Sequence, residues 1–542
     1  MKSLLTTLSF VSICSAFTAQ WSNNPAINTS ICTDAFKQND PRILDDGKGG
    51  AFIAWKDERN GLPDIYLQRV NKLGVPLWAV DGINICNEAS DQSTPNIISD
   101  MAGGVIVSWS DRRSDPINRD VYAQRVDSNG VVLWTVNGVA IANKPVREHN
   151  EKIASDGAGG AIVVWEQLDL DWDVWGQRVN ASGVVQWAPG GVALCQTGGK
   201  RINPKLQKDG RGGAIVTWQD MRVGVYDIYA QRISKDGVLQ WSNTAVPICA
   251  SANTQSNPKI DPSNSTGGAY ITWADKRNGL DYDIFLQKVD SNGIIQFAVN
   301  GIPVCSASGS QSAPEILSNK VVGVIVAWKD NRAGNTDIYA QRIDALGTAM
   351  WANNGVAVCN SAFNQINPNM CEDTLGGAIV TWQDSSSNGF NIKAQRINAN
   401  GTLMWLTNGI DIGTATDTQK SPKNVPDGKG GSIFVWQDKR VGIYDIFAHH
   451  IYDNGTYVNT ASLKEEVLTT VGVYPNPVND FLHIQVSDWK EVTLINNLGE
   501  LVFKANEVVE FIDVTSFANG FYLVKVVSNE GIVLHAKLDI QH

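Results

Sequence analysis

One tryptophan-centred segment recurs eight times along the chain, and this repeat constrains the fold more than any other feature. Successive copies are 53 to 56 residues apart. The tryptophans are Trp55, Trp109, Trp165, Trp218, Trp273, Trp328, Trp382 and Trp436. A period of this length is typical of arrays in which each repeat is one supersecondary unit that buries its apolar surface against its neighbours.

Turn signals divide each repeat into four short strands. In the third repeat, SDGAGGAIVVW (155–165) places a glycine-rich turn before a run that is apolar on both faces. WQDMRVGVYDIYAQR (218–232) then has the pattern of a strand end, a turn and a third strand, and pairs such as those in DSNG (127–130) predict a tight hairpin into the fourth. Such a sheet cannot be stable unless neighbouring sheets cover both of its faces.

The two ends of the array predict a closed ring. Residues 20–32 match the fourth strand of a repeat, whereas the last repeat stops after its third strand near Tyr452. Pairing these ends would complete the eighth sheet and remove the exposed edges. We therefore predict an all-β fold, an eight-bladed β-propeller of four-stranded antiparallel blades over residues 20–458, closed by the N-terminal strand.

An aspartate and an arginine recur at the corner that follows the core tryptophan, as in Trp218, Asp220 and Arg222. A residue repeated in nearly every blade indicates scaffold, because an enzyme needs only one active site. We predict a network in which the carboxylate accepts hydrogen bonds from the turn and pairs with the arginine. The alternative is a ring of cation sites.

Six cysteines share one repeat position, where the other two repeats have Ala142 and Gly413. They are Cys32, Cys86, Cys195, Cys249, Cys305 and Cys359. Small size is the common property, which predicts buried free thiols. A disulfide between Cys359 and Cys371 is the alternative.

Composition limits the partners and the chemistry. The formal net charge is −11 and no run of Lys or Arg occurs, so we expect no nucleic-acid partner. No HExxH, CxxC, GxSxG or phosphate-binding glycine loop is present, so we predict no catalytic residue, no metal and no cofactor, with calcium as the alternative. We expect a monomer.

The third repeat departs most from the pattern. WEQLDLDWDVWGQR (165–178) lacks the arginine and adds Asp169, Asp171, Trp172 and Trp175. An exposed acidic and aromatic loop suits stacking on a sugar or binding a cation, although a neutral variant of a surface turn is the alternative. We predict a non-enzymatic protein that binds glycan or protein on one propeller face. The alternative is a polysaccharide hydrolase or lyase that uses carboxylates such as Asp169 and Asp171.

The chain begins with the pattern of a secretory signal peptide, predicted over residues 1–19. One lysine precedes an apolar run from Leu4 to Ile13, and small residues follow. No other apolar stretch is long enough to cross a bilayer as a helix. We therefore expect an exported chain without a transmembrane helix.

After a polar linker (459–466), the composition changes over residues 467–542. The segments VGVYPNPVNDFLHIQV (471–486), NNLGELVF (496–503), FIDVTSFANGFYLVKV (511–526) and LHAKLDI (534–540) occur in order. Their alternation predicts a small β-sandwich, Ig-like in type. Together they resemble the type A C-terminal sorting domain of the type IX secretion system of Bacteroidota. The residues that carry the resemblance are Tyr474, Pro475, Asn476, Pro477, Gly499, Gly520 and Lys537.

This resemblance implies that the type IX secretion machinery is a partner and that the protein is secreted or held at the outer-membrane cell surface. The propeller repeats also resemble tandem units of secreted proteins from the same group. That second resemblance implies no particular activity.

Overall fold

A computed structural model describes residues 21–263, 267–319, 323–386, 389–457, 471–485, 489–496, 500–528 and 533–542. The chain divides into two compact units, Met1–Val458 and Asn459–His542. The predicted signal peptide and linker lie outside the described residues, as does Gly499.

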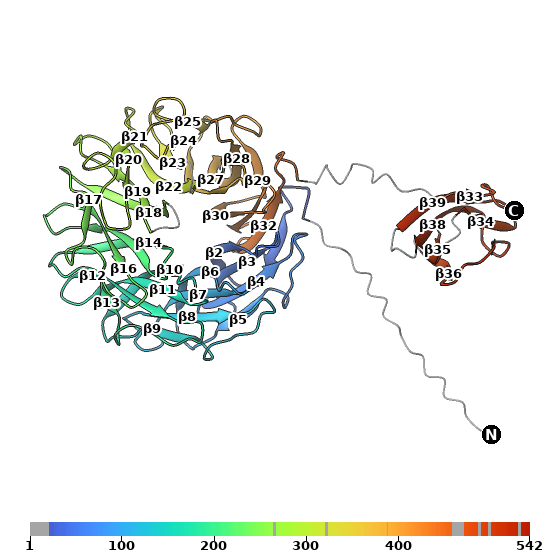
Figure 1. Ribbon diagram of the computed structural model, residues 1–542, viewed down its shortest axis with the longest axis horizontal. Coiled ribbons are helices and arrows are strands. Elements are labelled where there is room, and N and C mark those ends of the chain that lie inside the picture. The colour runs from blue at the N-terminus through green and yellow to red at the C-terminus, as the bar shows by residue number, and fades with distance from the viewer. Residues whose placement is uncertain are drawn as a thin grey trace, which may run out of the picture. The chain divides into compact units, whose positions relative to one another are not determined.

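Unit 1 is built from eight four-stranded antiparallel sheets arranged around an axis, which confirms the predicted propeller (Figure 1). The innermost strands are β2 (Gln38–Asp45), β6 (Gln92–Ser99), β10 (Arg147–Ser155), β14 (Arg201–Lys208), β18 (Gln255–Pro262), β22 (Gln311–Asn319), β26 (Gln365–Glu372) and β30 (Gln419–Pro426). The second strands are β3 (Ala51–Asp57), β7 (Val105–Asp111), β11 (Ala161–Leu168), β15 (Ala214–Asp220), β19 (Ala269–Asp275), β23 (Gly323–Asp330), β27 (Ala378–Ser386) and β31 (Ser432–Asp438).

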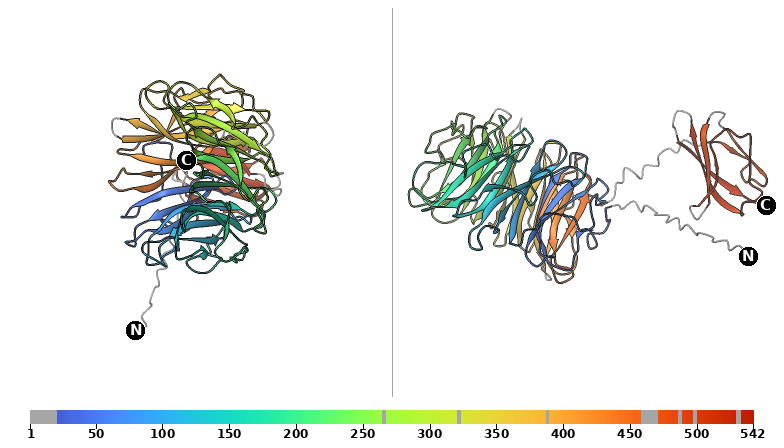
Figure 2. Two further views of the ribbon diagram at one scale, coloured as in Figure 1. Left: turned by 90° about the vertical axis from the view of Figure 1, so that its left-hand side faces the viewer. Right: turned by 90° about the horizontal axis from the view of Figure 1, so that it is seen from below.

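The third strands are β4 (Asp64–Val70), β8 (Asp120–Val126), β12 (Trp172–Val179), β16 (Asp227–Ile233), β20 (Asp283–Val289), β24 (Asp337–Ile343), β28 (Gly389–Ile397) and β32 (Asp445–Ile451). The outermost strands are β5 (Ile83–Cys86), β9 (Val139–Ala142), β13 (Val192–Ala193), β17 (Val246–Cys249), β21 (Ile302–Cys305), β25 (Val356–Cys359), β29 (Ile410–Gly413) and β1 (Thr29–Cys32). Figure 2 shows the twist of the blades from the side.

The N-terminal strand closes the ring. β1 is the fourth strand of blade eight, where Thr29 lies opposite Ala448 and Ser30 opposite Phe447 of β32. The Arg440 guanidinium also donates to the carbonyl of Ile27 at 2.6 Å. The two ends of the repeat array are therefore joined by pairing within one sheet.

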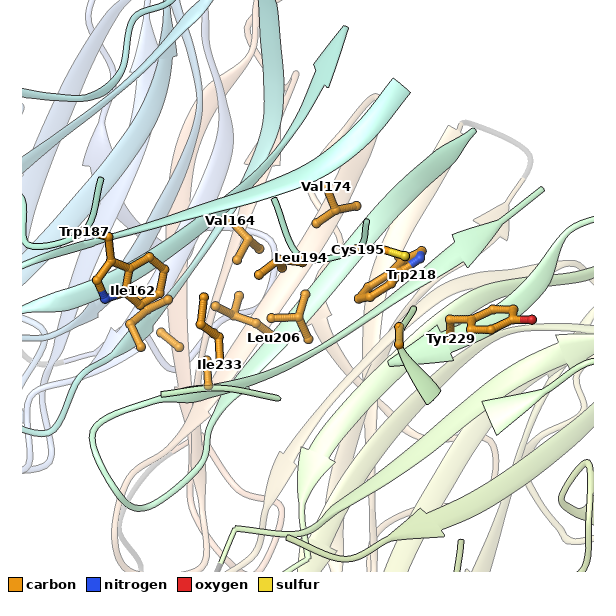
Figure 3. Packing of buried hydrophobic residues seen from close by; sticks show 14 residues of the cluster. Ile162, Val164, Val174, Trp187, Leu194, Cys195, Leu206, Trp218, Tyr229 and Ile233 are labelled. Atoms are coloured by element: carbon orange, nitrogen blue, oxygen red, sulfur yellow. The ribbon is translucent and has the colours of Figure 1, made fainter. Parts of the chain in front are cut away.

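The core consists of layers between adjacent blades. Between blades three and four, Val164 and Val174 face Leu206 and Trp218 (Figure 3). All eight core tryptophans are fully buried. Because burying a tryptophan removes roughly 150–250 Å² from water, each contributes on the order of 4–6 kcal/mol of hydrophobic free energy.

The recurring corner is a turn-stabilising network, as blade four illustrates. The Trp218 indole N–H donates to Asp220 Oδ2 at 3.0 Å, and Arg222 Nε donates to Asp220 Oδ1 at 2.8 Å. The Arg222 guanidinium lies 3.9 Å from the centre of the Tyr229 ring. The recurring carboxylate is thus occupied by its own tryptophan and arginine.

The seven cysteines within the described residues are buried free thiols, including Cys359 and Cys371, so the alternative of a disulfide between these two is wrong. Cys359 ends an outermost strand, whereas Cys371 lies on the innermost strand of the next blade. Cys371 instead contacts Ser432 and Asn424, with its sulfur 3.5 Å from Ser432 Oγ.

Unit 2 has two small antiparallel sheets around a core of its own, as predicted for a β-sandwich. Its strands are β33 (Val473–Tyr474), β34 (Phe481–Ile484), β35 (Trp489–Ile495), β36 (Leu501–Ala505), β37 (Ile512–Asp513), β38 (Gly520–Ser528) and β39 (Val533–Ile540). The side-chain amide of Asn476 donates to the carbonyl of Lys537 at 2.7 Å and accepts from the N–H of Asp539 at 2.9 Å. The Lys537 ammonium lies 3.9 Å from the centre of the Phe521 ring. The YPNP segment is thereby fixed to β39.

Candidate functional site

The corner of blade three replaces the Trp-Asp-Arg network with a different one. The Trp165 indole N–H donates to Gln167 Oε1 at 3.4 Å, and the Gln167 amide donates to Asp169 Oδ2 at 2.7 Å. Asp171 Oδ1 accepts the backbone N–H of Trp172 at 2.8 Å. Asp169 and Asp171 are exposed on this turn, and both take part in its hydrogen bonding.

Trp175 belongs to the packing between blades. It lies directly opposite Trp165, in the place where six of the other blades have a tyrosine or phenylalanine, and it packs against the core. The Lys144 ammonium, 3.5 Å from the centre of the Trp175 ring, takes the position of the missing arginine. Because Trp172 and Trp175 are three residues apart on one strand, their side chains leave opposite faces of the sheet. The structure therefore does not unite the four predicted residues in one cluster.

Trp172 instead contacts His149 from the innermost strand β10. The two ring centres are 4.5 Å apart. The guanidinium of Arg147 lies 5.6 Å from the centre of the Trp172 ring. His149 and Trp172 are half-buried and Arg147 is exposed, so an imidazole, an indole and a cation meet at a surface that a ligand can reach.

A buried carboxylate lies close to this histidine. His149 Nδ1 lies 3.8 Å from Glu166 Oε2. The other oxygen of Glu166 accepts the side-chain N–H of Asn150 at 2.5 Å and the backbone N–H of Asn203 in blade four at 2.6 Å. With Nδ1 beside Glu166, the other ring nitrogen, Nε2, is the one available to a ligand.

Burial lowers the pKa of His149, and the nearby guanidiniums of Arg147 and Arg119 act in the same direction against the attraction of Glu166. The imidazole is therefore neutral at neutral pH and can accept a proton. A neutral histidine beside a carboxylate and an aromatic ring is a suitable general base.

The neighbouring residue, Glu148, is a second departure in blade three. Most blades have a buried glutamine at this position. Burial and the carboxylate of Asp120 raise the pKa of Glu148 to about 8. Glu148 therefore carries a proton over most of the neutral range. In blade four the same position is Arg201, which pairs with Asp173 at 2.9 Å.

Sequence reasoning found the irregular turn but missed His149, Glu166 and Arg147 as members of a site. Blade three departs from the repeat at 147–149 and at 169–175. The position of Glu166 varies from blade to blade, so the repeat pattern does not mark this residue.

Among the residues that the structure describes, no group of three or more His, Cys, Asp or Glu is placed to hold a metal ion. The calcium alternative stays a prediction.

Comparison with known families identifies the C-terminal unit. Residues 472–541 match the family described as the secretion system C-terminal sorting domain. The fold and this match define an exported β-propeller-repeat protein. It carries a type IX secretion system sorting domain of the kind found in Bacteroidota, and it is secreted or located at the cell surface.

The other similarities are to part of a curated protein and to the fold of solved structures. Ulvan lyase NLR42 of Nonlabens ulvanivorans is 36% identical over 84 residues, which are 15% of this chain and 16% of that protein. A solved ulvan lyase of polysaccharide lyase family PL25 aligns over 82% of this chain and 98% of its own, with 10% identity and a TM-score of 0.41. An endo-arabinase of Bacteroides thetaiotaomicron aligns over 48% and 95%, with 14% identity and a TM-score of 0.28. Structural likeness at these TM-scores carries no argument about activity.

Over the described ranges, no helix is long and apolar enough to cross a membrane.

Proposed function

We propose that the exported propeller cleaves a uronate-bearing polysaccharide by β-elimination, with His149 as the general base. The observation that carries this proposal is the neutral imidazole of His149, with Nδ1 3.8 Å from buried Glu166 and its ring centre 4.5 Å from that of Trp172 at an accessible surface.

Each side chain has a role that follows from its chemistry. The Trp172 face stacks on a sugar ring. Arg147 pairs with the uronate carboxylate, which makes the hydrogen on the adjacent carbon more acidic. His149 Nε2 takes this proton while the bond to the departing sugar oxygen breaks. A carbon–carbon double bond forms, and the departing oxygen takes a proton from water.

The shared segment with an enzyme named an ulvan lyase supports action on polysaccharide. That segment is about one sixth of the relative, so the activity assigned here rests on the blade-three geometry. Hydrolysis by Asp169 and Asp171 is the weaker possibility, because both carboxylates are already engaged in the turn.

A second candidate is binding of glycan without turnover. The exposed cation of Arg147 beside the half-buried Trp172 favours it, since an aromatic platform with a neighbouring charge can hold a sugar without reacting.

A screen of purified protein against uronate-bearing polysaccharides tests the proposal through the ultraviolet absorbance of the unsaturated product. His149→Gln should abolish turnover yet still bind the polysaccharide. Trp172→Ala should raise KM more than it lowers kcat. The matched control is His483→Gln in unit 2, which should behave as the unmodified protein. Equal turnover by His149→Gln would overturn the assignment of the base.

A further inference from the structure

A second polar feature lies on the propeller axis. The innermost strands of all eight blades line a cavity of about 410 Å³, and each contributes the residue four positions after Gln38 or its equivalent. The charged members are Arg42, Lys152, Lys205, Lys259, Glu315 and Lys423. The two other blades contribute Asn96 and Asn369. We call these eight residues the channel ring.

The channel ring is strongly cationic in an acidic protein. Five cations and one carboxylate give the ring a formal charge of +4 (5 − 1), which Asp261 in the cavity wall lowers to +3 (4 − 1), whereas the whole chain has −11. Glu315 neutralises one cation through its ion pair with Lys259 at 2.5 Å. The Lys152 and Lys205 ammonium groups donate to oxygens of their own strands, at 2.8 Å to Asn150 Oδ1 and at 2.6 Å to Asn203 Oδ1. Because these acceptors are neutral, the opposing charges are nearby carboxylates, Glu151 and Glu166 for Lys152 and Glu166 and Glu315 for Lys205.

The cations of the channel ring lie close enough to repel one another. Burial, reinforced by the neighbouring cations Lys152 and Lys259, lowers the pKa of Lys205 to about 7. Burial, with Arg42 and Lys259 nearby, lowers the pKa of Lys423 to about 8. A multiply charged anion between these ammonium groups would relieve the repulsion and restore their protonation.

The cations of the channel ring come from separate blades and point to one cavity, unlike those of a surface charge cluster. Each cation is supplied by a different sheet, and all are half-buried around one shared cavity. Charges fixed around a partly desolvated cavity interact with a ligand more strongly than charges spread over an open surface.

We propose that the channel ring is a binding site for a sulfate or phosphate group, either as the free ion or as an ester on a polysaccharide. Such tetrahedral oxyanions match several ammonium and guanidinium donors arranged around one point. Asn150 links Lys152 of the ring to Glu166 of the blade-three surface, but the anion site does not depend on the reaction proposed there.

Titration calorimetry on the full chain in chloride buffer tests the site with three probes: inorganic sulfate, inorganic phosphate and a sulfated disaccharide. Binding of either inorganic ion identifies a free-ion site, and binding of the disaccharide alone identifies an ester site. Failure of all three to bind would overturn the proposal.

The double variant Lys205→Gln, Lys423→Gln supplies the structural test. It should weaken binding at least tenfold, whereas the control Lys72→Gln, at an exposed hairpin, should not change it. The double variant removes repulsion, so it should melt no lower than the unmodified protein without anion. Unchanged affinity in a folded double variant would contradict the site. His149→Gln should bind the anion normally, which separates this outcome from failure of the proposed reaction.

Discussion

The Trp-Asp-Arg corner shows how one residue can look functional and be structural. Asp220 is fully buried, accepts hydrogen bonds from Trp218 and Arg222, and pairs with that arginine. A buried carboxylate is tolerated only when it is paired in this way. The corresponding corner of blade three lacks this ion pair, because Gln167 replaces the aspartate and no arginine follows.

Glu148 gives a pH-dependent contribution to stability. Its folded-state pKa, about 8, lies above the ordinary glutamate value. The folded protein therefore binds one more proton than the unfolded chain between those two values, so stability falls as pH rises through about 8. Glu148→Gln, which introduces the residue found in most blades, should remove this loss. We expect a gain on the order of 3 kcal/mol at about pH 9 and little change at about pH 5.

Denaturant unfolding of both proteins across this pH range measures the effect. Gln92→Glu is the matched control, because the backbone N–H of Gln92 donates to the carbonyl of Pro63, next to Asp64, just as that of Glu148 donates to the carbonyl of Arg119, next to Asp120. It should introduce the same fall in stability at high pH. Parallel pH profiles for Glu148→Gln and the unmodified protein would contradict this account.

At the scale of the element, β1 determines whether the ring is closed. It covers the edge of β32 and brings Trp21 and Ile31, both buried, into the core between blades eight and one. A chain that starts at Thr33 should lose this pairing and expose an edge strand. We expect a loss of at least about 3–5 kcal/mol from the tryptophan alone, with aggregation.

Thermal unfolding with light scattering compares this truncation with a chain that starts at Trp21. The longer chain should melt cooperatively without aggregation. If both chains melted at the same temperature, β1 would not be the strand that closes the propeller.

At the scale of the whole molecule, we expect export to depend on the C-terminal unit and the proposed activity to depend on the propeller. The C-terminal unit has its own core and its own match to a sorting domain. Deleting residues 467–542 should therefore abolish release and surface display but leave a folded propeller inside the cell. Fractionation of cells, with circular dichroism of the retained protein, measures both. Surface display without this unit would contradict its role.

Charge at the propeller axis adds a second prediction at this scale. Lys205 faces Lys152, Lys259, Glu166 and Glu315, and Lys423 faces Glu315, Arg42 and Lys259. Both ammonium groups lose protons between about pH 7 and 8 in the empty channel, so anion affinity should fall as pH rises. We expect roughly tenfold per pH unit for each ammonium that the anion must reprotonate. Calorimetry from about pH 6 to 9 checks this, and a flat profile would mean that neither lysine takes part.

The fold could be predicted from the sequence because its signals are local and repeated eight times. The tryptophan period, the turn residues and the half repeat at each end specified the blades and their closure. The candidate site could not be predicted in this way. His149, Glu166 and Trp172 lie on three different strands, and no local sequence pattern specifies how these strands align. The channel ring was missed for a similar reason. Its members occupy one repeat position but differ in charge, and only the propeller axis brings them together.

The most direct test of the proposed function is cleavage of a uronate-bearing polysaccharide in water labelled with heavy oxygen, followed by mass spectrometry of the products. Elimination predicts an unsaturated uronate at the new non-reducing end, with no label beyond the anomeric exchange that a reducing sugar undergoes without enzyme, and His149→Gln should yield no unsaturated product. Saturated, labelled product above that exchange would establish hydrolysis, and intact polysaccharide that stays bound would establish a binding protein. Either result would contradict the role of His149 as the base of a lyase.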